Sequence, residues 1–240
     1  MGRAHEVRAA SMAKTAAAKS KLYAKWAKEI FVAAKAGVPD PEMNQPLKRI
    51  IEKAKREQVS ADVIKRAIEK AKGGGGENYT PVRYEGFGPA GTSFIVECLT
   101  DNVARTVAVV RSCFTKTGGT LGISGSVLHL FEHKAILSTS EFSEDDILDA
   151  LISNEVDNAD IETEDGVTVI YADVSDYNKV RQALHSLKED IVLVDDMITF
   201  LPYSYIEPKN EEDKNKVLRL IGFLDELEDV QEYYHNAKLD

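Results

Sequence analysis

Apolar positions in the first third of the chain recur at helical spacing. Residues 22–34 form one broad apolar stripe, and a second stripe begins at Met43 and ends at Ala54. A third stripe covers residues 63–71, and Ser60 stands where the N-cap of that helix is expected. Three short amphipathic helices with facing apolar stripes predict a small helical bundle.

After the four glycines Gly73–Gly76 the apolar period changes from helical spacing to alternation. Four consecutive glycines favour a flexible linker, so a domain boundary is expected there. Asp165-Gly166 is a hairpin turn signal, and Ser143 is followed by three acidic residues, as at a capped helix start. The mixture predicts an α+β protein. The expected strands are 84–87, 93–99, 127–137, 159–164, 167–172, 197–201 and 230–234, and the expected helices are 102–116, 143–153, 176–187 and 214–227.

Charge is distributed very unevenly along the 240 residues. The net charge of −10 alone argues against a nucleic-acid partner, yet residues 1–76 hold 17 Lys/Arg and 8 Asp/Glu, which is +9. Residues 77–140 are neutral with 5 of each sign, residues 141–204 carry 3 against 17, and residues 205–240 carry 5 against 10. This polarity predicts a basic module that meets a polyanion and an acidic module that does not.

A row of lysines marks the first helix. If that helix extends back to Lys14, five of its lysines fall within a sector of about 80° opposite the apolar stripe. These are Lys14, Lys21, Lys25, Lys28 and Lys35. One such face could be merely solvated, but the second and third helices add further cations and an N-terminal arm adds two arginines. We therefore predict phosphate contacts, which supply affinity without reading sequence. The candidate nucleic-acid-binding residues are Arg3, Arg8, Lys14, Lys21, Lys25, Lys28, Lys35, Lys48 and Arg49.

Two motifs resemble catalytic signatures. His129 to His133 reads H-x-x-E-H, but a zinc hydrolase needs that motif on a helix, and the flanking residues favour a strand, which separates the two imidazoles by about 13 Å. Gly86 to Gly91 reads G-x-G-x-x-G, but a strand follows it instead of a helix, so a hairpin turn is favoured, with phosphate contact by its backbone as a lesser alternative. We expect no catalytic residues, no metal and no cofactor.

Composition indicates in which cellular compartment the protein is expected. Two cysteines, Cys98 and Cys113, cannot form a disulfide framework, which favours a reducing compartment. No run approaches the roughly 18 apolar residues of a membrane helix, and the first residues lack the apolar segment of a secretory signal. A cytoplasmic location is therefore expected.

Several segments together resemble one known family. Residues 21–37 (KLYAKWAKEIFVAAKAG), 40–55 (DPEMNQPLKRIIEKAK) and 84–107 (YEGFGPAGTSFIVECLTDNVARTV) are similar to the YebC/PmpR family, as are 114–132 and 228–236. The family consists of probable transcriptional regulatory proteins of the bacterial cytoplasm. A mitochondrial relative activates translation, and bacterial members have been tied to the ribosome. The opening GRAHEVRAA departs from the family's common GHSKWANIK-type start, so functional detail attached to that start is not transferred.

The resemblance implies a domain plan. It implies a fold of three domains, an N-terminal three-helix bundle and two α+β domains, the third inserted into the second. On this sequence the expected domains are 1–76, then 77–132 with 206–240, and the acidic insertion 133–205. The proline-bracketed connection near 202–208 fits a return from the insertion.

Two functional hypotheses follow. The first is a non-enzymatic, DNA-binding regulator of transcription. The alternative is a ribosome-associated translation factor that binds ribosomal RNA through the basic helices, with the acidic domain facing basic ribosomal proteins. Lysine–phosphate contacts are common to both, so the sequence leaves DNA and RNA open, as it does the oligomeric state. An enzyme that uses the H-x-x-E-H segment is a third class, and it predicts bound zinc.

Overall fold

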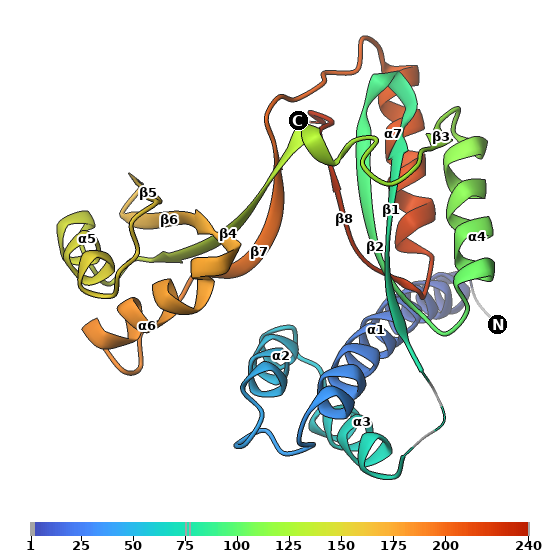
Figure 1. Ribbon diagram of the computed structural model, residues 1–240. Coiled ribbons are helices and arrows are strands. Elements are labelled where there is room, and N and C mark those ends of the chain that lie inside the picture. The colour runs from blue at the N-terminus through green and yellow to red at the C-terminus, as the bar shows by residue number, and fades with distance from the viewer. Residues whose placement is uncertain (1–2, 75, 77, 240) are drawn as a thin grey trace. The chain divides into compact units, whose positions relative to one another are not determined.

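The computed structural model describes residues 3–74, 76 and 78–239, and the side chains from residue 19 onward. This part of the chain is α+β, as predicted, and it has seven α-helices and two four-stranded antiparallel sheets (Figure 1). Two compact units are present. The described residues up to Ser124 and Pro208–Tyr233 form the first, and Gly125–Glu207 with the residues from Tyr234 onward form the second. The exact domain boundaries predicted from the sequence stay a prediction.

The first unit begins with the predicted bundle of α1 (Arg3–Ala36), α2 (Gln45–Arg56) and α3 (Ala61–Lys72). The apolar stripes of the three helices meet in one core, which is where amphipathic helices place their apolar faces. The core residues that lie deepest are Trp26, Ile30, Ala34, Leu47, Ile51, Ala54, Val59, Ile64 and Ala67.

The prediction that Met43 belongs to the buried face of the second helix is wrong. Its side chain is 72% exposed, because α2 begins only at Gln45. Asn44 is the N-cap, and its side-chain oxygen accepts from the Leu47 backbone N–H at 3.1 Å. The Asn44 amide also donates to the carbonyl oxygens of Ala33 and Val38, so this buried residue fixes the turn between α1 and α2.

The first sheet has the strand order β3-β1-β2-β8. The helices α4 and α7 pack against each other beside it, as Figure 1 shows, and the Phe94 and Phe114 rings meet edge to face in its core at 5.9 Å. This sheet and its helices consist of β1 (Thr80–Phe87), β2 (Ser93–Thr100), β3 (Thr120–Leu121), β8 (Val230–His235), α4 (Val103–Lys116) and α7 (Glu211–Asp225). The short strand β3 was not predicted, and the other elements differ from their predicted bounds by a few residues.

The second unit holds the sheet β5-β6-β4-β7 and two helices that bury its core. Its elements are β4 (Phe131–Thr139), β5 (Ala159–Glu164), β6 (Val167–Asp173), β7 (Asp195–Pro202), α5 (Glu144–Ser153) and α6 (Tyr177–Leu187). The expected hairpin is present, since Asp165 and Gly166 both have positive φ, 51° and 78°. The expected strand 127–137 is wrong at its start, because Leu128–Leu130 form a 3₁₀ turn.

Candidate nucleic-acid interface

The predicted lysine row lies on α1, but its members are not equivalent. Lys21 is exposed and has no ion pair within the described residues. Lys25 pairs with Glu232 at 2.7 Å, and Lys35 donates to the Asn78 side-chain oxygen at 2.8 Å. Arg3, Arg8 and Lys14 lie outside the residues whose side chains the structure describes. The row therefore has members that face solvent and members that contact the first sheet.

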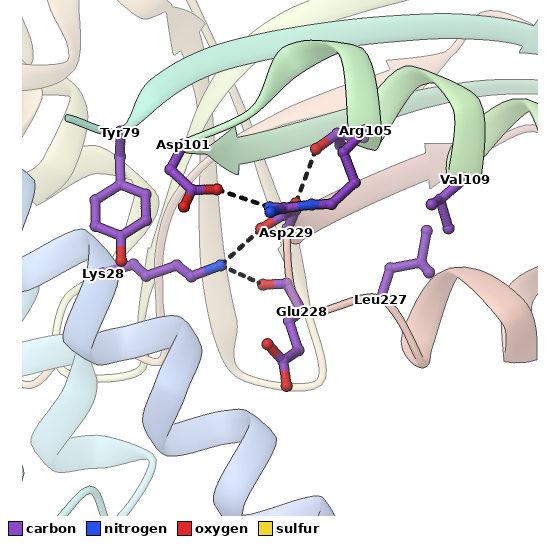
Figure 2. A pocket seen from close by; sticks show the side chains of 9 residues that line it. Lys28, Tyr79, Asp101, Arg105, Val109, Leu227, Glu228 and Asp229 are labelled. Atoms are coloured by element: carbon purple, nitrogen blue, oxygen red, sulfur yellow. Dashed lines mark hydrogen bonds and ion pairs between the residues drawn. The ribbon is translucent and has the colours of Figure 1, made fainter. Parts of the chain in front are cut away.

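Lys28 is the most strongly held of the row. Its ammonium donates to Asp229 Oδ1 at 2.8 Å and to the Glu228 carbonyl oxygen at 3.0 Å (Figure 2). Asp229 Oδ2 in turn accepts from Arg105 at 2.9 Å and from the Thr106 hydroxyl at 2.8 Å. Although burial opposes it, the hydrogen bonds from Lys28, Arg105 and Thr106 hold the pKa of the Asp229 carboxyl far below its usual range. Lys28 is thus an attachment point between the bundle and the sheet.

The second helix places its candidates elsewhere. Lys48 pairs with Glu42 at 3.2 Å and lines a groove of about 570 Å³ between α2 and α3, and Arg49 is half-buried on the same helix. Lysines and carboxylates are balanced along that groove. Its charged lining residues are Asp40, Glu42, Lys48, Glu52, Lys55, Lys65, Glu69 and Lys72. A balanced surface has little net attraction for phosphate.

A second groove, of about 380 Å³, runs between α1 and α3 and has a different composition. Three cations line it, namely Lys28, Arg66 and Lys70, and none of the described lining residues is a carboxylate. Its apolar lining includes Tyr79, which follows the glycine linker and is not among the residues predicted from the sequence. The available signal was an aromatic residue in an otherwise polar linker segment.

The glycine motif serves packing in the β1–β2 hairpin. A Cβ on Gly86 would lie 2.5 Å from the Phe114 ring, and a Cβ on Gly88 would lie 2.5 Å from the Thr92 hydroxyl oxygen. The turn between the strands also holds Ala90 at a φ of 60°. The expected hairpin turn is therefore confirmed, and close packing accounts for two of its glycines.

The H-x-x-E-H residues do not converge. His129 lies in the 3₁₀ turn with its Nδ1 3.4 Å from the Gly125 carbonyl oxygen, whereas His133 lies in β4 and stacks on Phe200 at 4.2 Å. In the described part of the chain no three His, Cys, Asp or Glu side chains form a group able to hold a metal ion. Each helix in the described part of the chain is too short or too polar to span a lipid bilayer.

Fold and surface together define a class of protein: a basic three-helix bundle at the N-terminus, followed by an α+β region whose second part is acidic. The chain matches the TACO1/YebC protein N-terminal domain over residues 3–74 and the TACO1/YebC second and third domain over residues 79–237. It therefore belongs to the TACO1/YebC family, and the resemblance found in the sequence is confirmed.

Curated relatives cover the chain from end to end. One from Acholeplasma laidlawii is 53% identical over 99% of this chain and 98% of its own length, and one from Vibrio atlanticus is 50% identical over the full length of both. Both are named probable transcriptional regulatory proteins. A crystal structure of a conserved hypothetical protein from Aquifex aeolicus is 36% identical, with a TM-score of 0.72 over 91% of this chain and 90% of that one. The names of the two curated relatives support a regulatory role.

Proposed function

We propose that this protein is a non-enzymatic regulator of gene expression that binds DNA in the cytoplasm through its basic bundle. The observation that carries the proposal is the separation of charge, +9 on residues 1–76 against −14 on residues 141–204. A polyanion is attracted to the first segment and repelled by the second. The names of the relatives support the regulatory part of the proposal.

The contacts that the structure describes divide the candidate residues by role. Lys21 and Lys35 would bind phosphates, and Arg3, Arg8 and Lys14 would extend their row toward the start of α1. Lys25 and Lys28 would chiefly hold the bundle on the sheet, because each already pairs with a carboxylate. Lys48 and Arg49 would contribute less, because the groove beside them has balanced charge.

The test is a mobility-shift titration with a duplex DNA at several salt concentrations. The variant Lys14→Glu/Lys21→Glu/Lys35→Glu is expected to lose at least about tenfold in affinity and to show a shallower dependence on salt. A matched control, Lys209→Glu/Lys214→Glu/Lys238→Glu, makes the same change of net charge outside the bundle and is expected to bind nearly as tightly as the wild type. Equal affinity of the first variant and the wild type would overturn the proposal. Tighter binding to RNA than to DNA would overturn its choice of DNA.

A further inference from the structure

The groove between α1 and α3 has aromatic walls. Tyr23 and Phe31 come from α1, and Tyr79 comes from the segment that precedes β1. The Phe31 and Tyr79 rings meet edge to face with their centroids 5.9 Å apart. Val63 and Ala67 of α3 complete the apolar lining. A flat apolar ligand would find aromatic faces and edges on one side and small aliphatic groups on the other.

The cations lie at the rim of these walls. Arg66 and Lys70 are one helical turn apart on α3 and both are exposed, so they share a face. The Lys70 ammonium lies 5.7 Å from the Phe31 ring centroid, and the Lys28 ammonium lies 5.5 Å from that of Tyr79. The Lys28 charge is already balanced by Asp229, so the positive charge of the rim comes from Arg66 and Lys70. With no carboxylate among the described lining residues, these two make the rim complementary to a ligand that carries negative charge.

A ligand that fits must therefore be flat and apolar in one part and anionic in the other. We propose that this groove holds one unpaired nucleotide of a single-stranded nucleic acid. Its base would stack against Tyr79 and Tyr23, which are half-buried, whereas Phe31 is only 3% exposed and packs edge to face on Tyr79. Its flanking phosphates would pair with Arg66 and Lys70. The volume of about 380 Å³ lies within the usual range of small-ligand pockets. Aromatic stacking beside a cationic groove is the chemistry by which proteins hold single strands.

This inference rests on the proposed function and narrows it. Phosphates along the lysine row would bind duplex and single strand alike, whereas the groove needs a base that is free to leave its stack. Duplex DNA would then contact the bundle without filling the groove. A locally opened strand would gain the additional stacking contact.

The experiment measures fluorescence anisotropy with labelled dT12, rU12 and a 12-residue abasic DNA strand, which has the same phosphates without bases. The wild type is expected to bind dT12 or rU12 about tenfold more tightly than the abasic strand, the size of one base–aromatic stack. Tyr79→Ala should weaken this preference, because only Tyr23 would then remain to stack on the base, and Tyr79→Phe should keep it. Arg66→Gln/Lys70→Gln should weaken binding of all three strands.

A matched control lies on the same helix. Lys65→Gln/Lys72→Gln removes two charges from the balanced groove between α2 and α3 and is expected to stay within about twofold of the wild type. Equal binding of base-bearing and abasic strands by the wild type would overturn the nucleotide site, and so would a Tyr79→Ala variant that keeps the preference. If the wild type binds duplex DNA but no single strand, only this inference fails. If it binds none of these nucleic acids, the proposed function fails with it.

Discussion

Lys28 and Asp229 stand 201 residues apart in the chain, yet their charged groups lie 2.8 Å apart. Both side chains are only 14% exposed. Lys28 belongs to α1 of the bundle, and Asp229 directly precedes β8 of the first sheet. A lysine of the predicted phosphate-binding row is therefore used to attach the basic helices to the α+β part of the same compact unit.

Replacing Asp229 by asparagine should destabilise this unit. The change leaves the largely buried Lys28 ammonium without its carboxylate and weakens the hydrogen bonds from Arg105 and Thr106. We expect a loss of about 3–5 kcal/mol in the free energy of unfolding, the range for removing one partner of a buried ion pair. Chemical denaturation at pH 7 measures it. The exposed neighbour Glu226→Gln is the control and should change stability by less than about 0.5 kcal/mol.

The Asp229 carboxylate also makes the stability of the folded protein depend on pH, in a direction that follows from its lowered pKa. Because its pKa is lowered in the folded protein, the contribution of Asp229 to stability is complete above the pKa of the unfolded chain, 3.8, and is lost as the pH falls below it. The stability difference between the wild type and Asp229→Asn should therefore be constant from pH 6 to 8 and shrink below about pH 4. A difference that stays constant down to pH 3 would contradict this assignment.

Much of the fold was predictable because local signals and burial agree. Ser143 caps α5 through a capping box with Asp146, and the turn at Asp165-Gly166 has the positive φ values that such a pair favours. Prediction failed where a neighbouring residue decides the structure. Met43 falls on the helical stripe, but Asn44 starts the helix after it, so the methionine stays in solvent.

The candidate site was less predictable, because its properties depend on contacts between distant segments. The lysine spacing indicates a row on α1 but cannot show that Lys25 and Lys28 face Glu232 and Asp229. Nor can it show that Tyr79 lies across from α1 beside Phe31. Periodicity describes the faces of one helix, whereas the chemistry of a groove depends on which faces meet.

Ser143 and Ser60 are both N-cap residues, but only Ser143 makes a capping hydrogen bond. The Ser143 side chain accepts from the Asp146 backbone N–H, and the Asp146 carboxylate accepts from the Ser143 N–H at 3.2 Å. Ser60 occupies the same position before α3, but its side chain makes no capping hydrogen bond. Ser143→Ala should therefore cost about 1 kcal/mol, and Ser60→Ala clearly less. Thermal unfolding of the two variants compares them, and equal losses would contradict the difference in capping.

Two glycines should respond to alanine in opposite directions. A Cβ on Gly86 would lie 2.5 Å from the Phe114 ring, so Gly86→Ala must displace a fully buried side chain. We expect a loss of about 1–3 kcal/mol. Gly222 lies within α7 with no atom within 4 Å of the position of a Cβ, so Gly222→Ala should stabilise the protein by about 0.5–1 kcal/mol. The denaturant midpoints of the two variants show whether each substitution lowers or raises the stability. If Gly86→Ala were neutral, packing against Phe114 could not be the reason for that glycine.

Glu29 also makes the stability of the protein depend on pH, but in the opposite direction to Asp229. Burial on α1 raises the pKa of this carboxyl from 4.5 to about 7. Neighbouring carboxylates also raise this pKa, whereas the nearby ammonium groups of Lys25 and Lys53 lower it. The folded protein therefore binds a proton that the unfolded chain releases between about pH 4.5 and 7, and stability falls as the pH rises through that range. Glu29→Gln removes the cost of burying the charge, so it should raise the free energy of unfolding by about 1–3 kcal/mol at pH 8 and change it little at pH 4.5. Denaturation curves at the two pH values, with the exposed Glu69→Gln as the control, measure this difference. A Glu29→Gln effect that is the same at both pH values would show that the carboxyl titrates alike in the folded and unfolded chain.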